Sequence, residues 1–381
     1  MGEVRFQIYT RVIKGVGAVK LVGEEAKSLG AKNALIVTGP NLARLGIVDE
    51  VKTHLSEAGL SCEVFAEVEP NPSVKTVERG KEIVLSGDFD LVIGLGGGSN
   101  IDAAKAIAVM AKNPGTICDY EGADKFQNPP LPIMAIPTTA GTGSEVTFAS
   151  VVTDTDRNYK FVVWSHLLAP KVAILDPSLL TTAPKSVIIA AGMDALTHAI
   201  ESYVSKLANV YTEQFALHAI ELISRNLPVF VADPTNLDAA DKMLTASNLA
   251  GIAFTNTRLG IVHAMALPPS ALFDVPHGIA NTILLPHGME FNRIGSPVKF
   301  AHIAYAMGEN APTTREASLL APEAVRKLAQ DIGAPLRLSE VGVKSDAIPR
   351  MAQDAMKSGH LAVNPRKVTI EDVLEIYRRA F

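Results

Sequence analysis

The pattern of hydrophobic and polar positions divides the chain into two parts, and the change lies near residues 177–184. In the first part, short apolar runs such as residues 34–38 and 90–95 predict strands that are buried on both faces. Strands that alternate with helices indicate βαβ units and a parallel sheet. Further strands are expected at residues 62–68, 132–136 and 172–175, and amphipathic helices at residues 48–58, 73–85 and 100–111.

The second part has helical periodicity in almost every long segment, punctuated by Pro and Gly. Before it, residues 145–154 and 159–164 predict an antiparallel hairpin, with Asp154, Asp156 and Asn158 in the turn. We therefore expect an α/β domain with a parallel sheet over residues 1–183 and an all-α domain over residues 184–381. The helices are expected at residues 186–206, 210–227, 237–255, 314–332 and 369–379.

Composition and charge exclude several classes of protein. The length of 381 residues suggests two domains, with one large domain as the alternative. A composition of 48% hydrophobic and 20% charged residues is ordinary for a globular protein. A net charge of −5 provides no basic field, so no nucleic-acid partner is expected. No apolar run approaches the length of a membrane span, so no membrane partner is expected either. Cys62 and Cys118 form no CxxC motif, and the N-terminal residues lack a signal-peptide core, which predicts a cytoplasmic location.

A set of metal-type side chains lies in the second part: Asp194, His198, His263 and His277. Asp194 and His198 are four residues apart, so a helix places them on one face. The surrounding segment is apolar, and a buried carboxylate and imidazole need partners for their polar atoms. One oxygen and three nitrogen donors suit Fe(II), Zn(II), Mn(II) or Ni(II). The alternative is an ordinary pair of core side chains, because spacing alone does not show that all four residues converge.

A glycine-rich loop follows the strand expected at residues 90–95 and leads into a helix. Its glycines, Gly97 and Gly98 among them, let the backbone approach a ligand, and the helix start favours an anion such as a pyrophosphate. Ser99 stands where the G-x-G-x-x-G fingerprint has its last glycine, and Asp102 in the first turn can cap the helix or orient the loop. The alternative is a tight turn between strand and helix. A second polar loop at residues 137–145 also follows a strand.

These motifs together resemble the iron-containing (group III) alcohol dehydrogenase family. The segments that carry the resemblance are GGGSNID at 96–102, PTTAGTGSE at 137–145, GMDALTHAIES at 192–202, HAMA at 263–266, PHGIANTILLPH at 276–287 and NPR at 364–366. The resemblance runs nearly from end to end. It implies a dinucleotide-binding N-terminal domain and a helical metal-binding C-terminal domain, an architecture shared with dehydroquinate synthase.

The resemblance also implies roles for single residues. By position, the metal ligands are Asp194, His198, His263 and His277, with Fe(II) as the metal and Zn(II) as its competitor. The pyrophosphate loop is Gly97, Gly98 and Ser99. Further cofactor contacts, with NAD(H) or NADP(H), are Asn71, Thr138, Thr139, Thr142, Lys160 and Leu179. The family further implies a homodimer or a larger homo-oligomer.

Three positions depart from the family pattern. Relatives often carry Asp after the strand at residues 34–38, where it repels a 2′-phosphate, whereas this chain has Gly39. We expect NADP(H) to be accepted for this reason, unless Gly39 only shapes the turn. Leu267 replaces a histidine thought to move protons in relatives, and Arg258 stands where relatives are often small. Arg258 favours an anionic aldehyde or is a solvated charge at a helix end.

The function predicted is a metal-dependent, NAD(P)-linked alcohol dehydrogenase or aldehyde reductase, which transfers hydride between the nicotinamide C4 and an alcohol or aldehyde held by the metal. One alternative is a metal- and NAD-dependent lyase resembling dehydroquinate synthase, but the apolar segments around His263 and His277 argue against a phosphorylated substrate. Another is a nucleotide-binding protein without catalysis. The substrate stays open, although Phe148, Phe254 and Phe273 hint at an apolar pocket.

Overall fold

The computed structural model describes residues 3–157 and 159–381, so the turn position expected at Asn158 lies outside the described residues. The chain forms two compact units. The first contains Ile8–Thr139 and Gly143–Thr182. The second contains Ala183–Phe381, together with Ala140–Thr142 and the N-terminal residues up to Gln7.

A six-stranded parallel sheet forms the core of the first unit, as the alternating pattern predicted. Its apolar runs form the central strands, which are buried on both faces. The edge strand β1 was not predicted, because most of its side chains are exposed and it contains no apolar run. The order across the sheet is β1 (Arg11–Lys14), β9 (Val172–Leu175), β6 (Ile133–Pro137), β4 (Leu91–Gly96), β2 (Asn33–Val37) and β3 (Ser61–Phe65).

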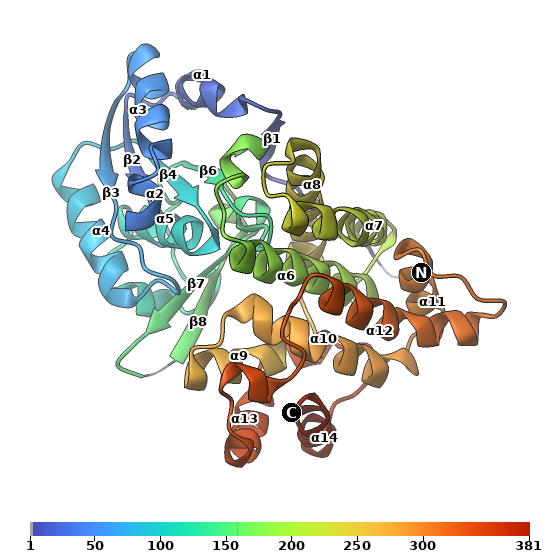
Figure 1. Ribbon diagram of the computed structural model, residues 1–381. Helices are drawn as coiled ribbons and strands as arrows, with labels where there is room; N and C mark the ends of the chain where they lie inside the picture. Colours follow the sequence, from blue (N-terminus) through green and yellow to red (C-terminus); the bar gives the residue numbers. More distant parts are fainter. Residues whose placement is uncertain (1–2, 158) are drawn as a thin grey trace. The chain divides into compact units, whose positions relative to one another are not determined.

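Helices pack on this sheet in two pairs (Figure 1). Helix α1 (Val22–Ser28) packs on α3 (Ile47–Glu57), and α4 (Val74–Ser86) packs on α5 (Gly98–Met110). Because the chain runs outward from β2 to β3 and then back across to β4, right-handed crossovers place α3 and α4 on opposite faces. The strand order therefore reverses between β2 and β4. Doubly wound sheets bind ligands at such a reversal, outside the carboxyl ends of the strands.

A hairpin lies between the sheet strands β6 and β9 along the chain, as predicted. Strand β7 (Ala149–Asp154) pairs antiparallel with β8 (Tyr159–Trp164), and the short β5 (Gly122–Ala123) pairs parallel with β8. The first strand of the hairpin begins later than expected. Gly143 adopts φ 61°, and the residues after it, Ser144–Val146, form a 3-10 turn.

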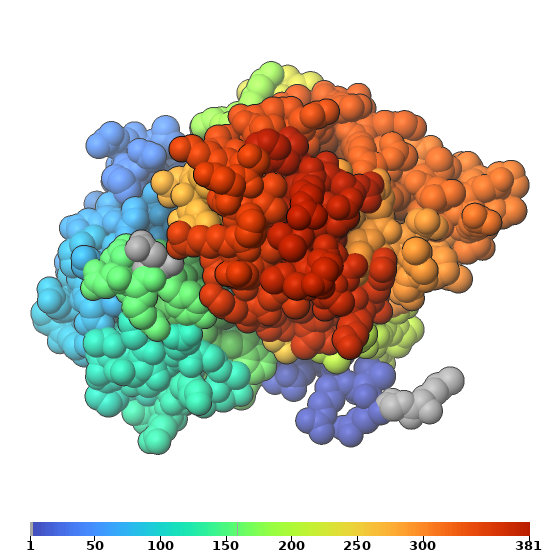
Figure 2. Space-filling model, turned by 90° about the horizontal axis from the view of Figure 1, so that it is seen from below, coloured from blue at the N-terminus to red at the C-terminus, as the bar shows by residue number. Residues whose placement is uncertain are grey.

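The second unit is helical. Helices α6 (Lys185–Val204), α7 (Val210–Ala232) and α8 (Leu237–Thr257) pack against one another, and α6 also packs against α10 (Figure 1). The C-terminal residues, red in Figure 2, form a broad part of the surface. The remaining helices of eight or more residues are α9 (Ile261–Phe273), α10 (His277–Arg293), α11 (Pro297–Ala306), α12 (Thr314–Asp331), α13 (Ile348–Ala355) and α14 (Ile370–Ala380).

The sequence pattern did not predict α9 and α10. Pro268 and Pro269 lie inside α9, and Pro286 lies inside α10. Proline removes a backbone donor and normally ends a helix, so the sequence pattern indicated breaks between helices at these segments. Most residues of both helices are buried, and tertiary packing outweighs the local penalty.

Helix α7 corrects the expectation that no segment reaches membrane-spanning length. Among the described residues it is the one helix long and apolar enough to cross a membrane, by length and composition alone. Its buried side chains, such as Ala216, Ile220 and Ile223, lie on the face that packs against α6 and α8. A core helix of this kind passes the same test, because its inner face is as apolar as a membrane span.

Candidate metal and cofactor sites

Helix α6 supplies the first two candidate ligands. Asp194 and His198 lie one turn apart on its buried face, with Oδ1 of Asp194 at 3.9 Å from Nε2 of His198. Both side chains are nearly inaccessible, at 7% and 6% exposure. The helix is buried almost without interruption from Gly192 to its end at Val204, so neither polar group can reach bulk water for solvation.

Helices α9 and α10 bring the other two candidates to the same carboxylate. Nε2 of His263 lies 3.7 Å and Nε2 of His277 lies 3.9 Å from Oδ1 of Asp194. The donor atoms of Asp194, His263 and His277 all lie within 4.8 Å of one another. The His263 ring stacks on that of His198, with centroids 4.7 Å apart. Solvent reaches the cluster at His277, whose side chain is 31% exposed.

A glycine allows α10 to approach α6 so closely. A Cβ atom on Gly278 would lie only 2.0 Å from the carbonyl oxygen of Ala190 on α6. No other residue fits this contact without moving one of the helices. Because His277 precedes Gly278, the contact sets the distance between His277 and the carboxylate of Asp194.

Hydrogen bonds fix the orientation of two imidazoles. Nδ1 of His263 donates to Oε2 of Glu201 at 2.7 Å, and Nδ1 of His198 lies 3.3 Å from the carbonyl oxygen of Gly141. Each bond places the proton on Nδ1 and leaves Nε2 free to bind a cation. Glu201 also accepts backbone N–H groups at the start of α9, from Gly260, Val262 and His263.

Charges within the cluster are strongly coupled. Burial alone would raise the pKa of the Asp194 carboxyl, but the surrounding histidines hold it well below its usual range. Burial lowers the pKa of His198 to about 4, which leaves this imidazole neutral at pH 7. Burial opposes a charge on His263 as well, but its contacts with Asp194 and Glu201 outweigh burial and raise its pKa to about 9. A divalent cation would replace that proton, because a ligating imidazole has to be neutral.

The donor set fits a divalent metal. A tetrahedral site with bonds of about 2.1 Å has ligand atoms roughly 3.4 Å apart. The separations from Asp194 Oδ1 are 3.7–3.9 Å, close to this value. The donor atoms that all lie within 4.8 Å of one another are those of Asp194, His263 and His277, and His198 is not part of that group. The amide nitrogen of Asn281 approaches the centre of the cluster. This residue was not predicted from the sequence. This nitrogen lies 2.7 Å from Oδ1 of Asp194 and 3.2 Å from Nε2 of both His263 and His277.

In the first unit, the glycine loop lies at the reversal of strand order. Gly97 is the N-cap of α5, and no side chain caps this turn within the described residues. The N–H groups of Gly98 and Ser99 therefore stand at an uncapped helix start, which attracts anions. A Cβ atom on Gly97 would meet Oγ1 of Thr139 at 3.4 Å, so the two candidate loops face each other closely.

Three of the predicted cofactor contacts form one hydrogen-bonded group. The backbone N–H of Asn71 donates to Oγ of Ser99 at 3.2 Å, and Nζ of Lys160 donates to Oδ1 of Asn71 at 2.9 Å. Asn71 adopts φ 58°, a conformation that asparagine tolerates better than most residues. The structure therefore gathers Asn71, Ser99 and Lys160 from parts of the chain far apart in sequence.

Asp102 occupies an anchoring position. One carboxylate oxygen accepts a hydrogen bond from Ser144, and the other accepts the backbone N–H of Val151 at 3.0 Å. The neighbouring Lys105 is fully buried and donates to oxygens of Ser144, Thr147 and Ala149. Burial lowers the pKa of Lys105 to about 8, although Asp102 and Glu145 oppose this. The pair fastens α5 to the polar loop and the hairpin, and sequence reasoning missed Lys105.

The other predicted cofactor residues are spread over three segments. Thr138 follows β6, is 5% exposed, and donates its backbone N–H to Gly96. Leu179 is 5% exposed in the short 3-10 helix Pro177–Leu180. Thr142 belongs to the short segment Ala140–Thr142, which clusters with the helical unit.

Gly39 follows β2 at the same reversal of strand order, as the N-cap of the short helix α2 (Pro40–Ala43). A Cβ atom here would lie 2.9 Å from the carbonyl oxygen of Val68. Close packing against Val68 is thus one reason for glycine at this position. That contact exists whether or not Gly39 also makes room for a 2′-phosphate.

The positions that depart from the family pattern lie around α8 and α9. Leu267 is half-buried in α9. Arg258 is exposed, ends α8 with φ 60°, and donates to the carbonyl oxygen of Gly359 at 3.1 Å.

Phe254 stacks on His198 with centroids 4.3 Å apart, so one wall beside the cluster is apolar. Phe148 packs within the first unit against Tyr9 and Trp164, and Phe273 is the half-buried last residue of α9.

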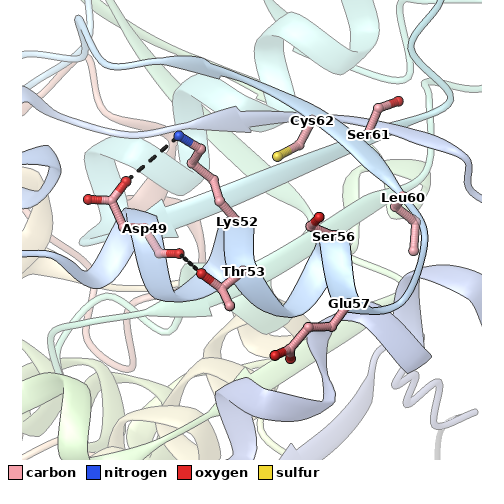
Figure 3. Close-up of a pocket in the computed structure, with 8 residues that line it drawn as sticks. All are labelled: Asp49, Lys52, Thr53, Ser56, Glu57, Leu60, Ser61 and Cys62. Carbon is pink, nitrogen blue, oxygen red and sulfur yellow. Dashed lines mark hydrogen bonds and ion pairs between the residues drawn. The ribbon is translucent and has the colours of Figure 1, made fainter.

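A surface hollow of about 580 Å³ lies between α3 and the edge strand β3 (Figure 3). Its polar groups bond among themselves, as in the contact of Lys52 Nζ with Asp49 Oδ1 at 3.7 Å. Burial raises the pKa of the Cys62 thiol, which makes the thiolate less favourable there. None of the candidate metal or cofactor residues takes part in it.

A doubly wound α/β unit with an uncapped glycine turn, joined to a helical unit with a carboxylate and three imidazoles, is typical of metal-dependent, dinucleotide-linked oxidoreductases. Comparison with known proteins identifies the family. The model of the iron-containing alcohol dehydrogenase family matches residues 10–177, and that of the C-terminal domain of Fe-containing alcohol dehydrogenases matches residues 188–381.

Individual relatives agree over almost the whole chain. The sequence is 46% identical to 1,3-propanediol dehydrogenase of Citrobacter freundii over 371 residues, which is 96% of each chain. It is 40% identical to NAD-dependent methanol dehydrogenase of Bacillus methanolicus over 368 residues, covering 96% of this chain and 97% of the relative. A crystal structure of 1,3-propanediol oxidoreductase superposes with a TM-score of 0.98 and 43% identity, covering all of both chains.

The chain belongs to the iron-containing alcohol dehydrogenase family, as the resemblance of its motifs indicated. It is an alcohol dehydrogenase or aldehyde reductase by class, and the family uses a metal and NAD(H). The lyase alternative is not favoured, because the family models and these relatives describe alcohol dehydrogenases.

Proposed function

We propose that this protein reduces small aldehydes and oxidises the corresponding alcohols at a metal held by Asp194, His198, His263 and His277. The observation that carries the proposal is the convergence of three histidine Nε2 atoms on one oxygen of Asp194, at 3.7–3.9 Å, from three different helices. When bound, the metal supplies Lewis acidity toward the substrate oxygen, and the nicotinamide supplies or accepts the hydride.

The protein's own groups prepare this chemistry. Glu201 and the Gly141 carbonyl hold the rings of His263 and His198 with Nε2 toward Asp194. Three of the four candidate ligands are at most 7% exposed, so water is largely excluded from that side. His277, at 31% exposure, marks the side from which a substrate approaches. The Phe254 ring beside His198 favours the carbon chain of the substrate over water.

For the cofactor, we propose that Gly97, Gly98 and Ser99 bind the pyrophosphate, since they form an uncapped helix start at the reversal of strand order. Asn71 and Lys160 form the polar group beside Ser99, and Thr138, Thr139, Thr142 and Leu179 complete the contacts. Asp102 positions the loop. Gly39 leaves out the acidic side chain that would repel a 2′-phosphate, so NADP(H) is accepted beside NAD(H).

The substrate is a small alcohol, diol or aldehyde. The names of two relatives refer to 1,3-propanediol and methanol, and an aromatic ring rather than a charged group lies against the cluster. We propose Fe(II) as the metal, because the family is iron-containing, with Zn(II) able to bind the same donors.

We also propose that residues 1–183 and 184–381 act as the nucleotide-binding and metal-binding domains of a cytoplasmic homo-oligomer. Cys62 and Cys118 are both free, which fits a reducing compartment. The edge strand β1 pairs on one side only among the described strands, and Ile8, Tyr9 and Val12 on or near it are exposed. Such an edge is suited to a second copy of the chain.

The test is anaerobic oxidation of NADH and NADPH by Fe(II)-loaded protein with a panel of short-chain aldehydes and their alcohols. Turnover should vanish in Asp194→Ala and survive in Asp238→Ala, which removes an exposed carboxylate from α8. A chelator should abolish turnover and added Fe(II) should restore it. No turnover by protein with confirmed metal and cofactor binding would contradict the proposal.

A further inference from the structure

Asn281 repeats on α10 the spacing that places two candidate ligands on α6. It follows His277 by four residues, just as His198 follows Asp194, so each helix directs an i, i+4 pair at the same point. The Nδ2 atom of Asn281 lies 2.7 Å from Asp194 Oδ1 and 3.2 Å from Nε2 of His263 and His277. One amide thus touches three of the four groups proposed to bind metal.

The other end of this amide is left without a partner. Asn281 is 0% exposed, and its Oδ1 atom forms no hydrogen bond within the described residues. A buried carbonyl oxygen without a donor is unfavourable and rare in native proteins. Nδ2 of Asn281 therefore has hydrogen-bond partners, whereas Oδ1 has none among the described residues. An amide oxygen is itself a suitable ligand for a divalent cation.

Nδ2 lies within 3.2 Å of atoms of Asp194, His263 and His277. A cation held by these three residues would therefore lie beside this amide. An N–H group has no lone pair to offer a cation, so the oxygen is the atom of this amide that could bind one. Rotation of the amide about its last side-chain bond exchanges nitrogen for oxygen at nearly the same place.

We propose that Asn281 is a further donor of the metal site, which presents Oδ1 to the bound cation. This rests on the proposed function, because it needs a metal at Asp194, His198, His263 and His277. It predicts an additional oxygen ligand beside the four. The competing view is that Asn281 is not a ligand and only hydrogen-bonds to Asp194 through Nδ2.

Asn281→Ala should raise the dissociation constant for Co(II) by about 10- to 100-fold, as for other supporting groups of metal sites. Because losing an amide that only orients Asp194 would also weaken binding, the coordination number of the bound Co(II) decides between the two views. Asn281→Asp keeps an oxygen at the same position and should bind Co(II) at least as tightly as the wild type.

The experiment measures Co(II) affinity of the full-length protein by competition with a chromogenic chelator, together with the visible spectrum of the bound ion. Loss of a ligand in Asn281→Ala should raise the intensity of the Co(II) d–d bands, because four-coordinate sites absorb more strongly than five-coordinate ones. Thr282→Val is the matched control, since Thr282 is the adjacent buried residue of α10 and its hydroxyl bonds to Gly278. Thermal unfolding without metal checks that each variant is folded.

A spectrum in Asn281→Ala that matches the wild type overturns the inference, whatever the change in affinity. Asp194→Ala in the same assay distinguishes this from failure of the proposed function. If Asp194→Ala loses Co(II) and Asn281→Ala keeps the wild-type spectrum, the metal site stands and Asn281 is not a donor. If the wild type binds no Co(II), both proposals fail. Should Asn281→Ala not fold, a wild-type spectrum in Asn281→Asp beside stronger bands in Asn281→Leu carries the same distinction.

Discussion

Glu201 and His263 are joined by a hydrogen bond of 2.7 Å between Oε2 and Nδ1, across 62 residues of sequence. The same carboxylate accepts the backbone N–H groups of Gly260 and Val262 at 3.0 and 2.7 Å. One side chain therefore fixes both the start of α9 and the orientation of the ring that α9 carries. The contacts with His263 and with these N–H groups hold the pKa of Glu201 below its usual range although it is buried.

Glu201→Gln should weaken metal binding by about 10- to 100-fold, because a carboxylate behind a ligating imidazole orients it and raises its basicity. The measurement is the Co(II) or Zn(II) dissociation constant by chelator competition. Glu221→Gln, in a partly exposed carboxylate of α7, is the control. Equal affinities in the wild type and Glu201→Gln would show that backbone packing alone orients His263. Glu201→Ala should in addition lower the free energy of unfolding by about 1–3 kcal/mol for each N–H group left unpaired.

Gly278→Ala should separate α10 from α6. Its methyl group would lie 2.0 Å from the Ala190 carbonyl oxygen, so His277 moves away from Asp194. We expect metal affinity to fall at least about tenfold, or about 1.4 kcal/mol in binding free energy. Gly288→Ala is the comparison on the same helix, since its methyl group would meet Cγ2 of Val262 on α9 at 2.5 Å rather than the backbone of α6. Similar losses in both variants would indicate general disruption of α10 rather than displacement of His277.

Cofactor choice tests the meaning of Gly39. If the missing carboxylate admits a 2′-phosphate, the wild type should use NADPH with a kcat/KM at least comparable with that for NADH. Gly39→Asp should then lower kcat/KM for NADPH by about tenfold or more relative to NADH, about 1.4 kcal/mol. Gly39→Ala separates charge from size, because any Cβ atom there meets the Val68 carbonyl at 2.9 Å. A tenfold preference of the wild type for NADH would contradict the hypothesis.

Features that depend on residues close together in the sequence were predictable, whereas contacts between residues far apart in the chain were not. The period of the apolar runs predicted the parallel sheet and the helical second part, because burial is read directly from the pattern. The shared face of Asp194 and His198 was predictable from a spacing of four. The approach of His263 and His277 was not, since it depends on helices α9 and α10, which contain prolines and were not predicted.

Two residues of the metal cluster were missed for different reasons. Asn281 carried a readable signal, because it follows His277 by one helical turn, but α10 was not recognised as a helix. Glu201 lies three residues after His198 and seven after Asp194, on the same face of α6, but its partner His263 lies 62 residues further on and could not be identified from that spacing. The motifs that resembled the family identified the ligands by position, whereas the groups that orient those ligands emerge only from the packed structure.

Acid stability should depend on His287, which is half-buried in α10. Burial, together with Arg326 and Arg379, lowers its pKa to about 4, although Glu290 opposes this, and its Nδ1 atom is buried without a partner among the described residues. In the unfolded chain a histidine has a pKa of about 6.5. Between these values the unfolded state binds a proton that the folded state does not, so stability rises with pH.

The contribution of His287 is therefore complete above about pH 6.5 and is lost as the pH falls toward about 4, with a slope of at most about 1.4 kcal/mol per pH unit. His287→Gln should flatten the dependence of the free energy of unfolding on pH by up to that slope, as measured by urea denaturation from pH 4 to 6.5. His218→Gln removes an exposed histidine of α7 and should keep the wild-type slope. If His287→Gln also keeps it, His287 takes up its proton without unfolding, and acid sensitivity arises from other buried groups.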